Sequence, residues 1–414
     1  MTRKMKDSGV EWIGKIPEEW EIKRVSNYFY QLKNKNQGLV EKNLLSLSYG
    51  NIVRRNIDSS DGLLPVSFDS YNIVSEGDIV LRMTDLQNDH KSLRTGFVRE
   101  KGIITSAYIT LRQKTDNVSS RYISLVLSSF DFMKGFYGLG NGVRQNVNFG
   151  DIRKINIPFP SIEAQCKIVS RVEGEVKRID SIISETQQSI NELKKYKQAL
   201  ITETVTKGLD KNVEMKDSGT PLLGKIPCNW ESKKLKYCVK IDDSKQTFSE
   251  GMKYIGLEHV NSGMGDINGY STVASNSLEK AFKKGDILYS KLRPYLAKAF
   301  IASFDGVSSG EFLVLQDFRG NKVFLKYWLI SNTFTDFVNA STYGTKMPRS
   351  SWETIKEMQM PLPSQQEQDE IVKYLDIKLR EVISLISNKV ELISKLRDYK
   401  SSLIYEYVTG KKEA

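Results

Sequence analysis

One long helical segment occurs twice in this chain of 414 residues, and the repeat limits how the chain can fold. The first copy begins at Ser161 and extends to about Gly208, and the second begins at Ser364 and extends to about Gly410. A shift of 203 positions superimposes the two copies. At about 1.5 Å per residue each helix would reach roughly 60 Å, which is too long for the wall of one compact domain.

Both copies carry apolar residues at an alternating spacing of three and four, the pattern of a seam between packed helices. The interruptions of the seam also correspond, since Thr186 matches Lys389 and Lys197 matches Lys400. Two equal helices in one chain are natural partners for each other. The predicted coiled-coil seam consists of Val169, Val172, Val176, Ile179, Ile183, Ile190, Leu193, Leu200, Val372, Leu375, Leu379, Val382, Ile386, Ile393, Leu396 and Leu403.

The duplication extends over each half of the chain. The leader at residues 5–21 begins Met-Lys-Asp-Ser-Gly and is repeated at residues 215–231. We therefore predict two halves related by a pseudo-two-fold axis, with the helices antiparallel and with Met1 close to Ala414. The predicted divisions are a first globular domain at 1–160, a first long helix at 161–208, a second globular domain at 209–363 and a second long helix at 364–414.

Both globular segments mix strand and helix patterns, so their predicted fold class is α/β (α+β). In the first segment, residues 103–112 predict a strand and residues 121–136 predict a helix. In the second segment, residues 311–315 predict a strand and residues 322–339 predict a helix.

The dipeptides Gly77-Asp78 and Gly285-Asp286 occupy equivalent places in the two segments. They predict a turn that enters a strand and has a structural role. After these markers the two segments differ in sequence and in loop length. A duplicated scaffold with two unlike surfaces suits a protein that recognises two unlike sites, and ordinary loop drift is the alternative.

The net charge of +11 is distributed unevenly. Residues 161–208 hold 8 Lys and Arg against 7 Asp and Glu, and residues 364–414 hold 9 against 9. The positive excess therefore lies in the globular segments. This distribution indicates globular segments that face a polyanion and helices that face protein, and a generally basic protein is the alternative.

The composition predicts a cytoplasmic protein with no membrane segment and no metal centre. No apolar run approaches the ~18 to 20 residues of a membrane span, and the start of the chain lacks the apolar core of a signal peptide. Three cysteines and two histidines are scattered without metal-ligand spacing; they are Cys166, Cys228, Cys238, His90 and His259.

Motifs of catalysis are absent from the sequence. There is no phosphate-binding Gly-x-x-x-x-Gly-Lys-Ser/Thr loop, and the glycines at residues 263–269 have a spacing that favours a turn over a dinucleotide site. The Asn/Asp-Pro-Pro-Tyr/Phe signature of adenine methyltransferases is also missing. We therefore predict no catalytic residues, no metal and no cofactor bound by this chain.

Basic side chains in the predicted loops suit DNA. Arginine and lysine pair with guanine edges, asparagine and glutamine pair with adenine, and all of them can contact phosphate. Taken one at a time, each basic residue also has the plainer interpretation of a solvated side chain or a phosphate contact. The candidate DNA-binding residues are Arg54, Arg55, Arg82, Lys91, Arg94, Arg144, Gln145 and Asn146 in the first segment, and Lys291, Arg293, Tyr295, Thr345, Lys346 and Arg349 in the second.

Further motifs accompany the duplication and span nearly the whole chain. They are Lys291–Leu296, Asp305–Phe312, Gly344–Arg349, and the proline-containing runs Ile157–Pro160 and Met360–Gln368 that open the helices. Together with the repeated leader, they give a chain that resembles the specificity subunit of type I restriction-modification systems. The motifs are specific as a set, whereas each alone is weak.

The resemblance implies two target-recognition domains, each of which reads one half of a split double-stranded DNA sequence. It implies that the two helices form an antiparallel coiled coil that fixes the distance between the half-sites. Two modification (methyltransferase) subunits would bind to this chain, and restriction/translocase subunits are an optional addition. The partner methyltransferases would bind S-adenosylmethionine and methylate a flipped adenine, so this chain itself would be non-catalytic.

By position in the resemblance, the loop Gly344–Arg349 faces DNA. The equivalent loop Gly140–Asn146 departs from this pattern because it lacks Met-Pro-Arg. Two alternatives stay open at the level of the sequence, a stand-alone DNA-binding regulator and a protein scaffold of the same architecture.

Overall fold

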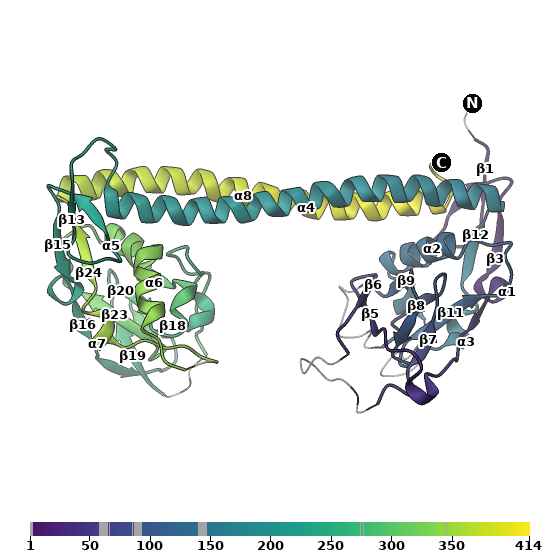
Figure 1. The fold of residues 1–414 in the computed structure, drawn as a ribbon, viewed down its shortest axis with the longest axis horizontal. Coiled ribbons are helices and arrows are strands. Elements are labelled where there is room, and N and C mark those ends of the chain that lie inside the picture. The colour runs from purple at the N-terminus through teal and green to yellow at the C-terminus, as the bar shows by residue number, and fades with distance from the viewer. Residues whose placement is uncertain are drawn as a thin grey trace. The chain divides into compact units, whose positions relative to one another are not determined.

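The computed structural model describes residues 3–57, 65, 67–84, 86, 93–139, 147–273, 275, 277–344 and 346–414. The chain forms two compact units, Met1–Glu185 with Glu391–Ala414, and Thr186–Val390. Each unit contains one globular domain together with part of each long helix, α4 (Ile162–Lys207) and α8 (Gln365–Val408) (Figure 1).

The two long helices begin and end with the same local signals. Ser161 and Ser364 each accept a hydrogen bond from the backbone N–H three residues later, at 3.3 Å and 3.2 Å, as N-cap side chains do. Gly208 and Gly410 take left-handed backbone conformations, with φ of 78° and 71°, just beyond the helix ends. Because of the second glycine, α8 ends at Val408 and does not continue through the end of the chain.

The helices pair antiparallel, as predicted. In the first unit Lys400 Nζ lies 2.7 Å from Asp180 Oδ1, and Arg171 Nε donates to Tyr407 Oη over 3.2 Å. Positions that ascend along α4 therefore meet positions that descend along α8. In the second unit Leu200 of α4 belongs to the same core cluster as Leu375 of α8.

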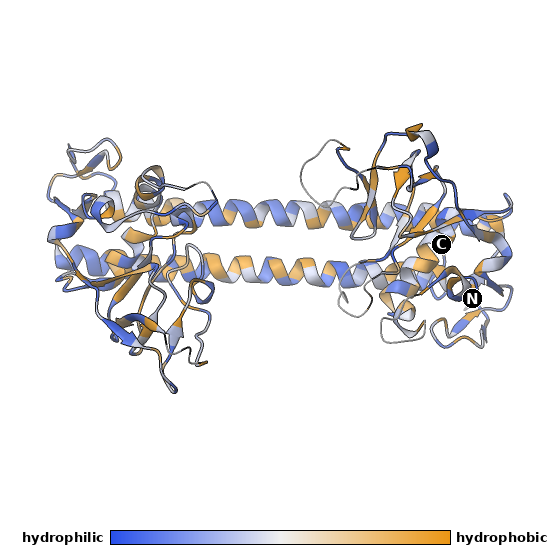
Figure 2. Ribbon diagram, turned by 90° about the horizontal axis from the view of Figure 1, so that it is seen from below, coloured by the Kyte–Doolittle hydropathy of each residue, from blue (hydrophilic) through white to orange (hydrophobic). Residues whose placement is uncertain are grey.

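All sixteen predicted seam residues are buried or half-buried, and apolar residues recur along both helices in Figure 2. The buried ones are Val172, Ile179, Ile190, Leu200, Val372, Leu375, Leu379, Val382, Ile393 and Leu403. The half-buried ones are Val169, Val176, Ile183, Leu193, Ile386 and Leu396.

Two of the three lysines that interrupt the seam, Lys197 and Lys400, make specific contacts. Lys400 bridges to Asp180 of the opposite helix. Lys197 is buried, and its Nζ donates to the Gly263 carbonyl of the second domain over 2.8 Å. Burial lowers the pKa of this lysine. One lysine therefore joins the two helices, and the other joins a helix to a globular domain.

The first domain contains a six-stranded sheet in the order β4-β11-β8-β9-β6-β5, with a separate β10-β7 pair. Its strands are β1 Met5–Asp7, β2 Lys15–Pro17, β3 Glu21–Arg24, β4 Phe29–Gln31, β5 Leu45–Ser48, β6 Asn51–Arg54, β7 Asn72–Val74, β8 Ile79–Leu81, β9 Thr95–Phe97, β10 Gly102–Ile104, β11 Ile109–Gln113 and β12 Asn156–Phe159. Its helices are α1 Val25–Tyr28, α2 Ser120–Phe132 and α3 Phe149–Ile152.

The second domain contains two four-stranded sheets, β16-β23-β20-β21 and β17-β19-β22-β18. Its strands are β13 Met215–Asp217, β14 Lys225–Pro227, β15 Glu231–Lys234, β16 Lys240–Asp242, β17 Lys245–Thr247, β18 Tyr254–Ile255, β19 Leu278–Phe282, β20 Ile287–Ser290, β21 Ala299–Ile301, β22 Gly306–Ser308, β23 Phe312–Gln316 and β24 Gln359–Leu362. Its helices are α5 Lys322–Leu329, α6 Asn332–Ala340 and α7 Trp352–Ile355.

The duplication extends to single hydrogen bonds. Gln165 and Gln368, equivalent residues near the starts of α4 and α8, each donate to the carbonyl of the proline five residues earlier over 3.0 Å. Their side-chain oxygens accept the N–H of Ser119 and of Asn321, at 2.9 Å and 2.8 Å. Ser119 and Asn321 are the N-caps of α2 and α5, so each glutamine anchors one domain helix to one long helix.

The Gly-Asp turns have the predicted structural role. The buried carboxylate of Asp78 accepts the Ser75 N–H over 2.8 Å and pairs with Arg112 at 2.7 Å. Asp286 likewise accepts the Lys283 N–H over 2.8 Å. Each aspartate closes the turn that leads into β8 or β20.

The helix predicted at residues 121–136 is α2, which ends at Phe132 because Lys134 takes a left-handed backbone conformation with φ of 61°. Two other predicted elements are divided in the structure. The strand predicted at residues 103–112 is β10 and β11, which belong to different sheets. The helix predicted at residues 322–339 is α5 and α6, because Ser331 takes an extended backbone conformation and caps α6 by accepting the Phe334 N–H. Both predictions merged neighbouring elements across a short polar break.

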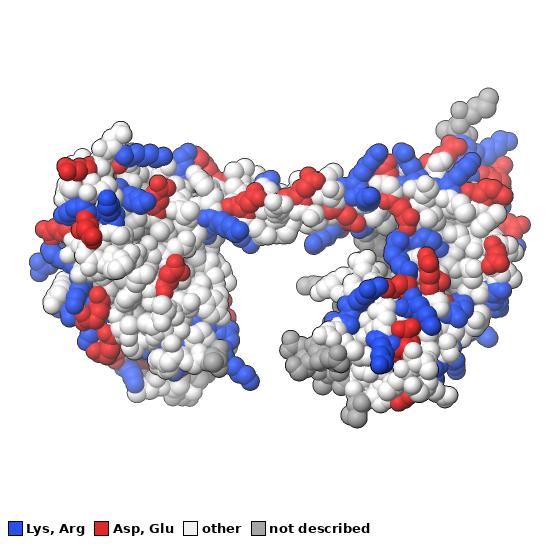
Figure 3. Space-filling view, viewed as in Figure 1, with Lys and Arg blue, Asp and Glu red and all other residues white. Residues whose placement is uncertain are grey.

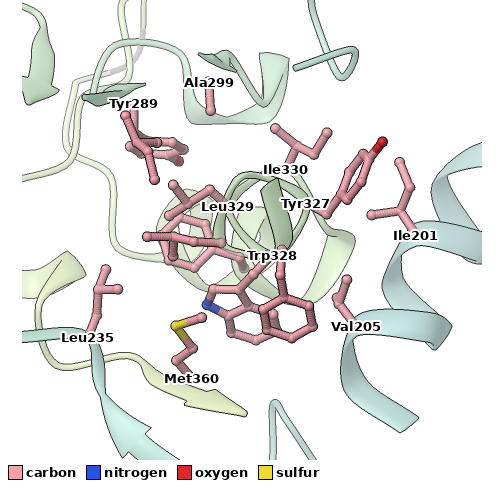
Figure 4. Packing of buried hydrophobic residues seen from close by; sticks show 14 of the residues in the cluster. Ile201, Val205, Leu235, Tyr289, Ala299, Tyr327, Trp328, Leu329, Ile330 and Met360 are labelled. Atoms are coloured by element: carbon pink, nitrogen blue, oxygen red, sulfur yellow. The ribbon is translucent and has the colours of Figure 1, made fainter. Parts of the chain in front are cut away.

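The core of the second unit fastens α4 to the domain. Figure 4 shows Trp328 and Tyr327 of α5 packed near Ile201 and Val205 of α4. All four side chains belong to one apolar cluster, which fixes the orientation of this domain on its helix.

In the first unit the end of α8 packs against the leader. Tyr405 Oη donates to the Trp12 carbonyl over 3.1 Å, and Lys411 Nζ donates to the Ile13 carbonyl over 2.6 Å. Arg3 and Ala414 line one small hollow, while Met1 lies outside the described residues. The first leader therefore contacts the C-terminal end of α8. The second leader, in contrast, follows the C-terminal end of α4 directly in the sequence.

Candidate nucleic-acid interface

Two loops of the second domain that are far apart in the sequence lie side by side. Arg293 N–H donates to the Pro348 carbonyl over 2.7 Å, and Ser350 N–H donates to the Lys291 carbonyl over 3.1 Å. Leu292 also forms a β-bridge with Arg349. The structure thus brings together two groups of predicted DNA-binding residues, those at 291–295 and those at 346–349.

These loops present a mixture of cations and apolar groups at the surface. Arg293 has a left-handed backbone, with φ of 50°, and precedes the short 3-10 helix Pro294–Leu296. Tyr295 is 52% exposed. The other exposed side chains among the described residues of the two loops belong to Arg293, Tyr343, Lys346, Met347 and Arg349. Such a surface suits nucleic acid, since cations contact phosphate and flat rings stack on bases.

An open hollow of about 510 Å³ lies beside the loops. Its charged lining contains Lys280, Lys291 and Arg349 against Asp243 and Glu311. Lys280 pairs with Asp243 at 2.7 Å, and Arg349 pairs with Glu311 at 2.5 Å. Burial, followed by the nearby Lys280 charge, lowers the pKa of Lys291. One cation is in excess, so the hollow favours a negatively charged or electron-rich ligand.

The sequence interpretation missed Lys280 and Asp243. Lys280 lies on β19, and Asp243 lies in the turn between β16 and β17, so neither belongs to the predicted DNA-binding loops. Lys280 occupies the same face of β19 as the buried Phe282. The sequence signal that could have revealed Lys280 is a lysine two positions before an apolar residue in a strand, because such a lysine shares the inward face.

The first domain presents a different set of cations. Arg54, on β6, pairs with Glu100 and remains largely exposed. Arg55 is exposed, whereas Arg82 is half-buried after β8. In Figure 3 the visible face of the first unit carries many basic side chains interspersed with acidic ones, while much of the visible face of the second unit is uncharged.

Arg94 is a correction to the predicted site. Its side chain is fully buried, and Nη1 donates to the carbonyls of Arg82 and Thr84 at 3.1 Å and 2.7 Å. Its Nε donates to Tyr137 Oη over 3.2 Å. Because these contacts lie inside the domain, the structure gives Arg94 a role in the fold and not at a DNA surface.

Five predicted residues lie outside the described part of the chain. They are Lys91, Arg144, Gln145, Asn146 and Thr345.

A second exposed surface lies on the helix pair. We define the outer face as Ile182 and Tyr196 of α4 with Leu385, Leu392 and Tyr399 of α8, which are between 44% and 54% exposed. Each precedes a position of the predicted seam or its interruptions by one residue, so they share one side of the seam. In the first unit this face consists of Ile182 from α4 with Leu392 and Tyr399 from α8. In the second unit it consists of Tyr196 from α4 and Leu385 from α8.

The other side of the seam faces the globular domains. Arg121 Nε donates to Glu173 Oε1 over 2.7 Å in the first unit. In the second unit Tyr327 Oη donates to Asp376 Oδ1 over 2.5 Å. Glu173 and Asp376 each follow a seam residue by one position, whereas the outer-face residues precede one.

No group of His, Cys, Asp or Glu among the described residues is arranged to hold a metal ion. Within the same part of the chain, no helix has both the length and the apolar character needed to cross a membrane.

Comparison with protein families decides the affiliation of the chain. The profile described as type I restriction modification DNA specificity domain matches residues 17–195 and again residues 227–394. The chain belongs to this family. Each match includes one globular domain with part of one long helix, so the family unit coincides with the internal repeat of this specificity chain.

Two relatives have informative names. The chain is 27% identical over 247 residues to the type I restriction enzyme EcoDI specificity subunit of Escherichia coli, an alignment that spans 55% of each protein. It is 25% identical over 417 residues to the type I restriction enzyme MjaVIII specificity subunit of Methanocaldococcus jannaschii, covering 96% of this chain and 94% of that protein. The chain thus matches about half the length of the first relative and nearly all of the second.

Solved structures share the fold of this specificity chain. A chain from a study of complex assembly and conformational transition in a type I R-M system aligns with a TM-score of 0.68 at 14% identity, covering 96% of this chain and 99% of that one. The HsdS subunit of Thermoanaerobacter tengcongensis aligns with a TM-score of 0.50 at 14% identity, covering 99% and 100%. These similarities support the fold of two tandem mixed α/β domains with long helices.

Proposed function

We propose that this chain is the DNA-recognition subunit of a type I restriction-modification complex and that it reads a two-part, asymmetric DNA site. The observation that carries the proposal is the pair of unlike basic loop surfaces on one duplicated scaffold. The second domain joins Lys291, Arg293 and Arg349 in one loop region, whereas the first domain exposes Arg54 and Arg55 from β6 and its end. Equivalent scaffolds with unlike surfaces recognise unlike half-sites.

The outer face is the proposed docking surface for two methyltransferase subunits. Ile182 matches Leu385 and Tyr196 matches Tyr399 under the shift of 203 positions, so the surface occurs in two equivalent copies. Exposed tyrosine and leucine at heptad spacing suit a helix of a partner protein. Two equivalent copies suit two identical partners, and restriction/translocase subunits would join this assembly.

The chemistry belongs to the partners in this proposal. The methyltransferase subunits would bind S-adenosylmethionine and transfer its methyl group to a flipped adenine. This chain would supply DNA recognition and the spacing between half-sites without catalysis of its own. A cytoplasmic location accompanies this function, because the substrate is cellular DNA.

Mapping of adenine methylation in cells with and without this chain tests the proposal. One two-part methylated motif should vanish when the chain is deleted and return when it is restored. Replacement of residues 22–160 by the corresponding segment of another family member should alter one half of the motif and keep the other. A methylation map that does not respond to the chain would contradict the proposal and favour a stand-alone regulator or a scaffold.

The salt dependence of duplex binding separates DNA recognition from a protein scaffold. Phosphate contacts release counterions, so the logarithm of the binding constant should fall linearly with the logarithm of salt concentration. A duplex affinity that does not change with salt concentration would contradict the proposed DNA-binding role.

A further inference from the structure

The ion pair between Arg349 and Glu311 lies at the edge of the hollow in the second domain. Arg349 Nη2 donates to Glu311 Oε1 over 2.5 Å. The arginine side chain is 45% exposed and the glutamate side chain is 24% exposed. The carboxylate therefore lies beneath the guanidinium, and the guanidinium faces outward.

The backbone around Arg349 is held in place. Its N–H donates to the Tyr343 carbonyl, and its carbonyl accepts the Tyr343 N–H, both over 3.1 Å. The β-bridge to Leu292 holds the opposite side of the strand-like segment. Arg349 thus projects from a fixed frame, although it belongs to a surface loop.

Glu311 is equally well fixed. Its carbonyl accepts the Lys291 N–H over 2.9 Å, and its own N–H donates to Ser309 Oγ over 3.3 Å. It directly precedes β23, a strand in the middle of its sheet. Oε2 is buried and has no hydrogen-bond partner among the described residues, so the carboxylate is committed to nearby positive charge.

A guanidinium that is held at one nitrogen keeps its plane and leaves its other N–H donors for a ligand. Two parallel N–H donors match the O6 and N7 acceptors of guanine in the major groove, and no other base edge offers this pair of acceptors. The other cations of this region fit less well. Lys280 is paired and buried, and a lysine is a point charge without fixed donor geometry.

Arg293 provides a contrast on the neighbouring loop. It is exposed, and its side chain has no hydrogen-bond partner among the described residues. An arginine whose side chain has no such partner suits phosphate, which rewards charge more than orientation. The two arginines therefore separate into a positioned side chain and an unpositioned one.

We propose that Arg349, held in orientation by Glu311, reads a guanine in the half-site recognised by the second domain. The inference rests on the proposed DNA-recognition function and adds the base, the reading side chain and the positioning residue. Glu311 acts through Arg349 and does not contact DNA itself.

The test uses the chain assembled with its methyltransferase partners and selects bound duplexes from a random pool. The variants are Arg349→Ala, Arg349→Lys and Glu311→Gln, with Arg293→Ala as the matched control. We expect Arg349→Ala to lose the preference at one guanine position of one half-site by about 10-fold to 100-fold. Arg349→Lys keeps the charge and should keep overall affinity better, yet lose the same preference. Glu311→Gln should relax that position in part, because the guanidinium loses its anchor.

The control should weaken binding to all sequences about equally and leave every base preference intact. The inference is overturned if folded Arg349 variants retain every guanine preference, or if Arg293→Ala relaxes the same position equally. It is also overturned if Glu311→Gln leaves that position as sharp as in the wild type. A wild-type complex that selects no two-part sequence contradicts the proposed function itself, and the inference falls with it.

Discussion

Arg94 donates its backbone N–H to the carboxylate of Asp131 over 2.5 Å, and both side chains are buried in the first domain. Asp131 lies near the end of α2, and Arg94 directly precedes β9. The contact therefore ties a sheet strand to the helix beside it. An arginine that belongs to the fold and an arginine that contacts DNA should respond differently to substitution.

Arg94→Met should lower the free energy of unfolding by about 2 to 4 kcal/mol, because two backbone carbonyls lose a buried charged donor. DNA affinity per folded molecule should stay within about twofold, since a stability change alone leaves a folded surface intact. Denaturant unfolding and binding by the folded fraction measure the two quantities. Arg55→Ala is the control, with stability unchanged and affinity reduced. If a folded Arg94 variant binds DNA as poorly as the Arg55 variant does, Arg94 contributes to DNA binding and the prediction is wrong.

The stability of the first domain should depend on the ionisation of Asp131. Burial raises the pKa of its carboxyl group to about 6, so the folded state holds a proton that the unfolded state loses near pH 4. The free energy of unfolding should therefore fall as the pH rises from 4 to 6 and then level, by up to about 3 kcal/mol. Asp131→Asn should remove this contribution. Unfolding curves of both proteins across this pH range provide the measurement, and parallel pH profiles would contradict the assignment.

The long helices were predictable because their signals are local and repeated. The apolar residues of the seam recur at a spacing of three and four, which can be read from a single sequence. Ser161 caps the N-terminus of α4 with its side chain, and Gly208 ends the helix with a left-handed backbone. The second copy at Ser364 and Gly410 repeats the same signals. An antiparallel partnership then followed from the internal duplication.

The candidate site was less predictable because burial depends on tertiary contacts. Arg94 and Arg293 both appear in the sequence as loop arginines, yet one is enclosed and the other is exposed. The pairing of Lys280 with Asp243 requires β19 to be placed beside a distant turn, which no local pattern specifies. The break at Ser331 was also hidden, since apolar residues continue on both sides of it.

The outer face should determine how many methyltransferase subunits bind. Tyr196→Ala and Tyr399→Ala should each weaken one docking site by about 2 kcal/mol, or roughly 30-fold, as loss of a tyrosine anchor does. At intermediate concentrations each single variant should hold one partner, and the double variant should hold none. Light scattering of the purified complexes gives the stoichiometry. Lys195→Ala, next to Tyr196 and also exposed, is the control and should hold two partners. Full assembly by the double variant would rule out this face.

The length of the helix pair should set the permitted gap between the half-sites. An insertion of seven residues after Gln188 in α4, matched by seven residues after Val390 in α8, keeps the seam in register because the pattern repeats every seven residues. Seven helical residues add about 10 Å, which corresponds to roughly three base pairs. The selected gap should therefore lengthen by about three base pairs, while the bases of both half-sites stay the same.

An insertion of seven residues in α4 alone serves as the control for the role of helix length. It shifts the seam of α4 past that of α8 on one side of the insertion, so that either the contacts around the Asp180–Lys400 pair or those around Leu200 and Leu375 are lost, and it should destabilise the chain without producing a new defined gap. Selection of bound duplexes from a pool with variable gaps distinguishes the two variants. If the matched insertion folds, assembles with its partners and still selects the original gap, the distance between half-sites is set elsewhere, because only the helices were lengthened.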